Sequence, residues 1–334
     1  MRISLPSDMA AGFSNRRSKE DRKDDEAHLD AKIEARLSGV IGEVAEAIEA
    51  PPAGTRYRHS IHPAESLRSL GRARGLVRAL AERDLRVRYK QAHLGIAWAI
   101  ISPAILMIVF SLLMNRGVLS VSTGGKPTYL FAYVGLVPWT FFANVVSQGG
   151  MSLVSNLYLV NKIFCPREVF PLTSALVCAV DGLVSALLFL ILFPISGTHP
   201  ALTTVWVPVL LVIEIAFTIG VTLIISIVTV YMRDLRHLLG IIVQFGLFVT
   251  PVMYSMSNIP GKHLNRLAIP SHLIGFYTVI DPLAPLIDGI RRTVLFGQAP
   301  QWGYVGISAV VSGITLIGGF LLFKRLEYGI ADVA

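Results

Sequence analysis

The chain is poor in cysteine and in charge, and each shortage excludes a class of protein. Its 334 residues include only two cysteines, Cys165 and Cys178, which are too few for a disulfide scaffold or a zinc-type cluster. Only 16% of the residues are charged, against roughly 25% in an average soluble protein. Residues 1–94 hold 18 Lys and Arg and 14 Asp and Glu, which leaves 12 and 8 for the rest. So little charge cannot cover a soluble surface, and a soluble enzyme is excluded.

The sequence also lacks a phosphate-binding loop. The nearest candidate, Gly124-Gly125-Lys126, has Ser120 where the motif needs its first glycine, and Pro127 follows the lysine. The eight histidines are scattered, so no group has the spacing of metal ligands. We therefore expect no metal and no ATP site in this chain. We attribute the net charge of +8 to basic loops beside a membrane rather than to nucleic-acid binding.

What the chain does have is apolar residues, 53% of the total, gathered in long runs. Because about 20 apolar residues span a bilayer as a helix, the runs predict six spans, at 94–114, 129–147, 169–195, 205–230, 238–254 and 304–323. The stretch 269–290 is apolar but is interrupted by prolines and aspartates. Broken backbone is tolerated at membrane depth only where protein or water satisfies it, so this stretch predicts two short re-entrant or interfacial helices.

Lys and Arg set the expected orientation, because the cytoplasmic flanks of membrane spans are rich in these cations. Seven lie between Arg72 and Lys90, before the first span, and alternate loops on that side add Lys162, Arg167, Arg233, Arg236, Lys324 and Arg325. Both termini are therefore expected in the cytoplasm. Residues 1–70 contain no apolar core of signal-peptide length, so we expect the first span to remain as an uncleaved anchor.

The region before the first span divides into a polar extension and a basic helix. Residues 26–50 carry apolar residues at three- and four-residue steps, which predicts a helix that docks on a partner, lies on the membrane or has no specific task. Residues 67–90 interleave cations with apolar residues, which favours an amphipathic interfacial helix held by anionic membrane lipids over a simple positive flank. We expect three parts: an extension over 1–66, this helix over 67–93 and a membrane domain over 94–334.

Several runs within 67–334 resemble one family of membrane proteins. They are similar to the membrane subunits of type-2 ABC exporters, in the branch that exports O-antigen, capsular polysaccharide and teichoic acid. The resemblance rests on RDLRVRYKQAHLGIAWAIISP (83–103), GLVPWTFFANVV (135–146), NLYLVNKIFCPREVFPL (156–172), MRDLRHLLGIIVQFGLFVTPVMYS (232–255), DPLAPLIDGIRRTVL (281–295) and the tail 327–333.

The resemblance implies an all-α polytopic permease with six transmembrane helices, an amino-terminal interfacial helix and short re-entrant gate helices before the last span. Two copies would form a pore in the bacterial inner membrane. A separate nucleotide-binding ATPase subunit, which uses ATP and magnesium, would power the export of a lipid-linked polysaccharide from the cytoplasmic to the outer face. The permease itself would then be no enzyme.

The stretch before the third span resembles the family's coupling helix, which contacts the ATPase. The residues expected there are Asn156, Lys162, Pro166, Arg167 and Glu168, where proline ends the short helix and the charged side chains make polar contacts across an aqueous interface. Loop charge alone is the alternative for the two cations. A second cationic group is expected to meet the substrate pyrophosphate or lipid headgroups, because guanidinium groups bind phosphate oxygens; it comprises Arg83, Arg86, Arg88 and Lys90.

A substrate path is expected along the second span, because aromatic rings stack on the apolar faces of sugars. Its aromatic candidates are Tyr133, Trp139, Phe141 and Phe142, with helix packing as the alternative and membrane anchoring as the alternative for Tyr133. Asp181 and Glu214 are the acids inside spans; they line the path, make structural contacts or, least favoured, relay protons. The outer gate is expected at Asp281, Pro282 and Pro285. The pattern suggests no role for Arg291 and Arg292.

Three rival functions stay open at this point. In the first, the same fold would export teichoic acid, another lipid or a drug in place of a polysaccharide of the O-antigen or capsule type. An ion-gradient-driven transporter would show inverted repeats and more intramembrane charge. A membrane-bound glycan-modifying enzyme would have to use Asp281 and Asp288.

Overall fold

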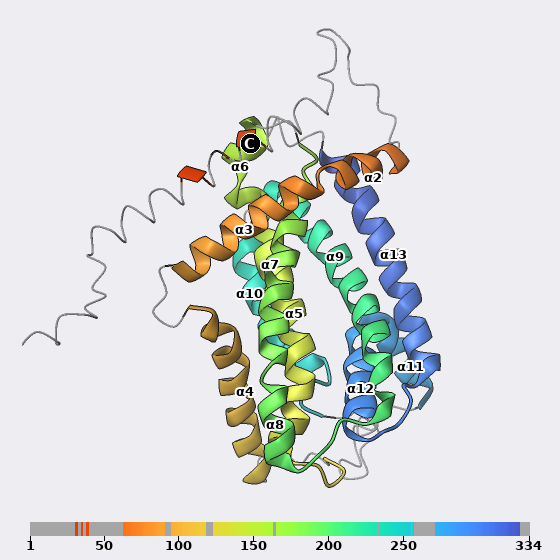
Figure 1. Cartoon of the computed structure of the whole chain (residues 1–334). Helices are drawn as coiled ribbons and strands as arrows, with labels where there is room; N and C mark the ends of the chain where they lie inside the picture. The colour runs from red at the N-terminus through yellow and green to blue at the C-terminus, as the bar shows by residue number, and fades with distance from the viewer. Residues whose placement is uncertain are drawn as a thin grey trace, which may run out of the picture.

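In the computed structural model, every regular element of the described residues is a helix (Figure 1). The structure describes residues 63–90, 95–117, 123–162, 165–232, 234–254, 256 and 271–327, with five positions between 31 and 39. Arg233, most of the helix expected over 26–50 and most of the tail 327–333 lie outside the described residues. In chain order the elements are α2 (Pro63–Arg72), α3 (Arg74–Lys90), η1 (Gly95–Ala97), α4 (Trp98–Asn115), α5 (Thr128–Ser155), α6 (Leu157–Lys162), α7 (Val169–Ala186), α8 (Phe189–Ser196), η2 (Leu202–Trp206), α9 (Val207–Tyr231), α10 (Leu235–Val249), α11 (Ser271–Ile280), α12 (Leu283–Leu295) and α13 (Trp302–Glu327).

Five helical segments among the described residues are long and apolar enough to cross a membrane. They are Gly95–Asn115, Thr128–Ser155, Val169–Ser196, Leu202–Tyr231 and Trp302–Glu327. The fifth span expected from the sequence, 238–254, corresponds to α10, which has only 15 residues. Thr250 leaves the helix in an extended conformation, because the proline that follows it at position 251 disfavours helical geometry at the preceding residue. The structure therefore gives five spans and one shorter apolar helix, and the count of six is not confirmed.

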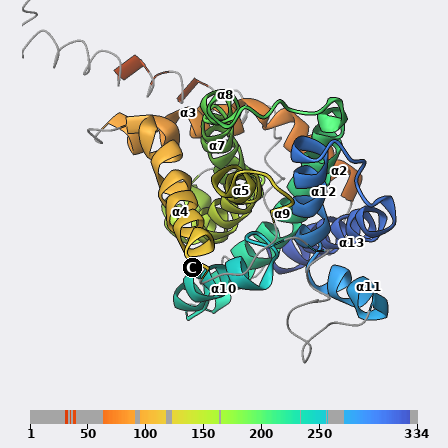
Figure 2. The same ribbon diagram turned by 90° about the horizontal axis from the view of Figure 1, so that it is seen from below.

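Helix α5 lies at the centre of the bundle, between α4, α7, α9 and α10 (Figure 2). Small residues bring the neighbouring backbones close, as is common between membrane helices. A Cβ atom at Gly149 of α5 would lie 2.4 Å from a methyl carbon of Thr222 on α9. A Cβ atom at Gly319 of α13 would lie 2.5 Å from the carbonyl oxygen of Gly220 on α9. Glycine at these positions therefore sets the spacing of the α5–α9–α13 layer.

Two helices precede the first span where the sequence pattern predicted one. The helical region breaks at Ala73 into α2 and α3, which lie across one end of the bundle (Figure 1). Leu76 and Leu80 of α3 are buried in a cluster with Leu153 of α5 and Phe323 of α13. The apolar side of α3 thus packs on the bundle itself, and its contact with membrane lipids stays a prediction.

The proline-broken stretch before the last span forms two short helices, α11 and α12. They lie toward the end of the bundle opposite α2 and α3 (Figure 1). Almost every residue of α12 is buried, because the helix is enclosed by α5, α9 and α13. The re-entrant placement of these helices stays a prediction.

Candidate functional site

The short helix α6 lies at the same end of the bundle as α3 and the last turn of α13 (Figure 1). Asn156 separates it from α5: its side-chain amide donates to the Ser152 carbonyl at 2.9 Å, and its side-chain oxygen accepts from Arg83 at 3.3 Å. Tyr158 of α6 is 68% exposed whereas Val160 is buried, so α6 packs on the bundle through one face and leaves the other open. Lys162 ends α6, and its side chain lies outside the described residues.

Glu168 does not take the exposed position expected of a residue that contacts a partner. Its side chain is only 1% exposed and faces Lys324 of α13, with the Nζ and Oε1 atoms 2.5 Å apart. Lys324 also pairs with Glu327 at 2.8 Å, and Arg167 donates to the Glu327 backbone carbonyl. The four residues tie the start of α7 to the last turn of α13, and we call them the α7–α13 clamp. Glu168 is buried because it neutralises a lysine of its own chain.

Burial raises the pKa of Glu168, and the neighbouring Glu327 raises it further, while Lys324 lowers it. Pro166 precedes this clamp and accepts a hydrogen bond from Val169 at 3.1 Å. It therefore opens the turn into α7. Helix α6 is described as far as Lys162, and the two residues after it lie outside the described residues, so the expectation that Pro166 ends the short helix stays a prediction.

Arg88 was expected at the entry for substrate or lipid, and Asp181 either on the substrate path or in a structural contact; the structure pairs the two residues. Arg88 of α3 forms an ion pair with Asp181 of α7 and donates to Gln148 of α5. Tyr89 donates to the other oxygen of Asp181. Burial lowers the pKa of Arg88, but Asp181, Cys178 and Tyr89 together more than offset that effect and the pKa is raised; burial raises the pKa of Tyr89 to about 12. This cluster, which we call the α3–α7 junction, gives Asp181 a structural partner that no local pattern indicated.

The other cations expected near it are placed differently. Arg83 pairs with its neighbour Asp84 at 2.8 Å and donates to Asn156. Arg86 is partly exposed, and Lys90 is exposed at the end of α3. Arg83 and Arg88 are partly exposed as well, with 31% of each side chain accessible, so Lys90 is the most exposed of the four cations.

A cavity of about 490 Å³ adjoins the α3–α7 junction. It lies between α3, α4, α5 and α7, and its polar walls include Arg88, Tyr89, Asp181 and Ser185. Trp98 and Trp139 add aromatic surface. Charged groups beside aromatic faces can contact both the polar and the apolar surfaces of a sugar.

The aromatic residues of α5 are mostly packing residues within the single chain. Tyr133 is fully buried, donates to the Ser185 carbonyl at 2.7 Å and contacts the ring of Phe189. It therefore neither anchors at a membrane surface nor lines an open path. Phe142 stacks on Phe217 of α9 with ring centroids 5.9 Å apart.

Trp139 and Phe141 line cavities despite their position in the bundle. Trp139 is 5% exposed, and a Cβ atom at Gly246 of α10 would lie 2.7 Å from its ring. Phe141 borders the polar cavity and a second, apolar one. The chain thus brings Trp139, Phe141 and Asp181 to one cavity and holds Tyr133 and Phe142 away from it.

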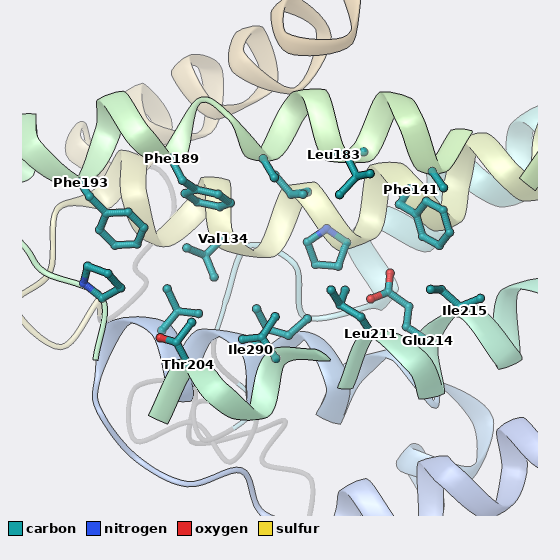
Figure 3. Close-up of a pocket in the computed structure, with 18 residues that line it drawn as sticks. Val134, Phe141, Leu183, Phe189, Phe193, Thr204, Leu211, Glu214, Ile215 and Ile290 are labelled. Atoms are coloured by element: carbon teal, nitrogen blue, oxygen red, sulfur yellow. The ribbon is translucent and has the colours of Figure 1, made fainter. Parts of the chain in front are cut away.

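Glu214 lies in the second cavity, which has a volume of about 450 Å³ (Figure 3). The walls come from α5, α7, α8, α9 and α12, and they are apolar except for Thr204 and Glu214. Glu214 is fully buried. Within the described part of the chain, neither of its carboxyl oxygens has a hydrogen-bond partner. Glu214 and Asp181 therefore line different cavities, and their place on a substrate path stays a prediction.

The residues expected at the outer gate form the start of α12. Asp281 accepts a hydrogen bond from the backbone N–H of Leu283 at 3.2 Å and one from the Tyr277 hydroxyl at 3.3 Å. Pro282 and Pro285 flank the first turn, where proline is tolerated because the N–H groups there have no helical partner. These contacts account for the helix start, and gating stays a prediction.

Arg291 is the residue that sequence reasoning missed. It is 1% exposed and donates to the backbone carbonyls of Val252 at 2.7 Å and Tyr254 at 3.0 Å. Its guanidinium lies 4.1 Å from the centre of the Phe131 ring and 3.9 Å from the Asp288 carboxylate. Arg291 thus fastens the chain after α10 to α12 and α5. The only sequence signal was a charge in an apolar stretch, which does not reveal its partners.

Comparison with known proteins now decides the family. Residues 75–293 match the family described as ABC-2 type transporter. The chain belongs to this ABC-2 family. The match runs from α3 into α12 and so includes α6, the α3–α7 junction, the polar cavity, all of the apolar cavity but Val294, and Arg291.

Named relatives of this ABC-2 protein are export permeases. The O-antigen export system permease protein RfbA of Myxococcus xanthus is 30% identical, over 80% of this chain and 98% of its own length. The protein of the same name from Klebsiella pneumoniae is 26% identical, over 79% and 97%. The polysialic acid transport protein KpsM of Escherichia coli is 24% identical, over 75% and 93%.

Together, the family and the apolar helices indicate a multi-pass inner-membrane subunit of an ABC transporter. In such ABC-2 transporters the ATPase is a separate subunit. Among the described residues, no group of three or more His, Cys, Asp and Glu side chains is arranged to hold a metal ion.

Proposed function

We propose that the chain is the transmembrane half of an ATP-driven exporter that moves a lipid-linked polysaccharide of the O-antigen or capsule type from the cytoplasmic to the outer face of the membrane. Two copies of the chain form the conduit, and two copies of an ATPase subunit that binds ATP and magnesium supply the energy. The observation that carries the proposal is the similarity to O-antigen export permeases over 97–98% of their length.

The distribution of charge supports a cytoplasmic location for the end of the bundle that bears α3 and α6. Arg78, Arg86 and Lys90 of α3 lie at this end, as do Lys324 and Arg325 in the last turn of α13 (Figure 1). Cations gather on the cytoplasmic side of membrane proteins. We therefore place the exposed face of α6 where an ATPase can reach it.

The α7–α13 clamp gives this contact a route into the bundle. A push on α6 reaches the start of α7, and the Glu168–Lys324 ion pair passes the displacement to α13. Glu168 therefore acts inside the permease, whereas the exposed Tyr158 of α6 is a better candidate for the ATPase contact. This assignment replaces the expectation that Glu168 itself crosses the aqueous interface.

Co-purification tests the proposal. The tagged chain is isolated from its native membrane, and the complex is reconstituted in vesicles that contain lipid-linked glycan. We expect a stoichiometric ATPase subunit and glycan translocation that stops when ATP is removed. A chain that purifies without an ATPase and moves substrate on an ion gradient would overturn the proposal.

The same assay separates the exporter from its near rival with another cargo. Vesicles that contain a lipid-linked teichoic acid in place of the polysaccharide are the matched control. Faster ATP-dependent movement of the teichoic acid would reassign the substrate and leave the ATPase partnership intact.

A further inference from the structure

The apolar cavity around Glu214 has the features of a built ligand site. Its volume of about 450 Å³ falls within the range of roughly 300–1,000 Å³ that is usual for small-molecule sites, which are mostly apolar with a few placed polar groups. Figure 3 shows the Glu214 side chain extending from α9 into the cavity, toward the wall that contains Phe141 and Leu183. One carboxyl group in an apolar space is therefore the chemical signature of this site.

The state of that carboxyl follows from its surroundings. Burying an isolated carboxylate in an apolar medium costs far more than burying the neutral acid. Among the described residues Glu214 has no hydrogen-bond partner and no ion pair, so nothing offsets the cost of a charge. A neutral carboxyl offers one O–H donor and one carbonyl acceptor, and both are vacant here.

The cavity is reached from the side of the bundle that contacts lipid. Leu183, which lines it, is 71% exposed on the outer surface of α7. Leu211 and Ile215 of α9 also line the cavity and are 37% and 39% exposed. A molecule that enters between α7 and α9 therefore comes from the hydrocarbon of the bilayer and must itself be apolar along most of its length.

We propose that this cavity binds a single-chain amphiphile with a neutral hydroxyl head group, such as a long-chain alcohol. The hydroxyl donates to the carbonyl oxygen of Glu214 and accepts from its O–H, so both vacant groups are satisfied without a charge. The chain lies along the apolar walls of α5, α7 and α8. The apolar cavity shares Phe141 and Gly182 with the polar one, but Glu214 and the walls from α8 and α9 belong to the apolar cavity alone.

Photolabelling tests the proposal. The full-length chain in lipid nanodiscs is exposed to dodecanol that carries a diazirine on its chain, and labelled peptides are identified by mass spectrometry. We expect saturable labelling of α7 or α9 near Glu214 that excess dodecanol displaces and dodecane does not. Glu214→Leu should weaken binding about tenfold, which corresponds to about 1.4 kcal/mol. Glu214→Gln should keep it, because the amide also has a donor and an acceptor.

Two further variants control for folding. Ser226→Ala removes another buried polar group of α9 outside the cavity and should label like the wild type. Ala186→Leu fills the cavity from α7 and should lose labelling while Glu214 is intact. The proposal is overturned if Glu214→Leu labels like the wild type, if dodecane competes as well as dodecanol, or if dodecylamine competes better than both. None of these outcomes bears on polysaccharide export.

Discussion

Arg291 shows how a single buried cation can organise a membrane protein. Its guanidinium donates to two backbone carbonyls of the segment after α10. It also lies over the ring of Phe131 and pairs with the carboxylate of Asp288. No other residue type offers five donors in a planar fork. The segment that follows α10 therefore has its place fixed by a side chain nearly 40 residues further along.

Replacement of Arg291 by methionine should destabilise the fold strongly. The change leaves two buried carbonyls without a donor and Asp288 without its cation, and breaking a buried pair costs about 3–5 kcal/mol. Unfolding of the purified protein in increasing denaturing detergent measures the loss. Arg292→Met is the matched control, because Arg292 is only partly buried, whereas Arg291 is fully buried. Equal losses in the two variants would contradict the assigned role of Arg291.

Cys165, between α6 and α7, should react slowly with alkylating agents. Burial raises the pKa of its thiol to about 11; Glu327 and Glu168 raise it too, and Arg167 lowers it. Only the thiolate reacts, and an ordinary cysteine has a pKa of roughly 8.5. In a Cys178→Ala background we expect alkylation by iodoacetamide at pH 8 to be more than about 100-fold slower than for a free cysteine.

The pH dependence of that rate has a defined direction. The rate should rise about tenfold per pH unit up to about pH 11, whereas a free cysteine levels off near pH 9. Because the folded chain holds this proton more tightly than the unfolded chain, the associated stability is complete below about pH 8.5 and is lost toward pH 11. A rate that levels off by pH 9 would show that the pKa of the Cys165 thiol is not raised in the folded chain.

Among the helices, the contact between α9 and α13 depends on glycine more than on side-chain shape. A Cβ atom at Gly319 would lie 2.5 Å from the Gly220 carbonyl oxygen, while one at Gly318 would meet nothing within 4 Å. Neighbouring glycines of one helix thus have opposite tolerance for a methyl group.

Gly319→Ala should therefore separate α13 from α9 and lower stability by about 1–3 kcal/mol, the usual cost of overpacking. Gly318→Ala, on the exposed side, should be neutral or slightly stabilising because alanine is the better helix former. The melting temperatures of the two purified variants provide the comparison. A Gly319→Ala protein as stable as the wild type would mean that the two helices are not in backbone contact.

The hydrophobic runs predicted most of these helices but not their ends or interruptions. Five runs became long helices because length and apolarity alone decide which segments can span a bilayer. The run at 238–254 forms a shorter apolar helix, because the Thr250–Pro251 step ends α10 after 15 residues, and its membrane crossing stays unconfirmed. The break at Ala73 that divides α2 from α3 has no sequence signal that we identified.

The partners of charged residues were the least predictable feature. Arg88 lies 93 residues from Asp181 in the chain, and Glu168 meets Lys324 at the far end of the sequence. Such pairs depend on how helices that are distant in the sequence pack together, so the local spacing of residues does not predict them. Sequence reasoning therefore found that Asp181 lies in a span but left its contacts open, and it placed Glu168 at the ATPase interface without any sign of the ion pair with Lys324.

For the molecule as a whole, the proposed orientation makes opposite ends of the bundle accessible from opposite sides of the membrane. A single cysteine at Tyr158 of α6 or at Gln298, between α12 and α13, tests this in a background without Cys165 and Cys178; both positions are exposed. In intact spheroplasts a membrane-impermeant maleimide should label Gln298→Cys and spare Tyr158→Cys, and lysis should expose the latter. The reverse pattern would invert the topology.

The α7–α13 clamp has a practical consequence for anyone who attaches a reporter to this protein. Arg167 and Lys324 hold Glu327, the last residue of α13, beside the turn that leads out of α6. A fluorescent protein fused shortly behind α13 would therefore begin next to the surface proposed for the ATPase and would compete with it for space. Affinity tags and fluorophores should be attached to the amino-terminal extension instead. A carboxyl-terminal fusion that shows no transport should not be taken as evidence that the protein itself is inactive.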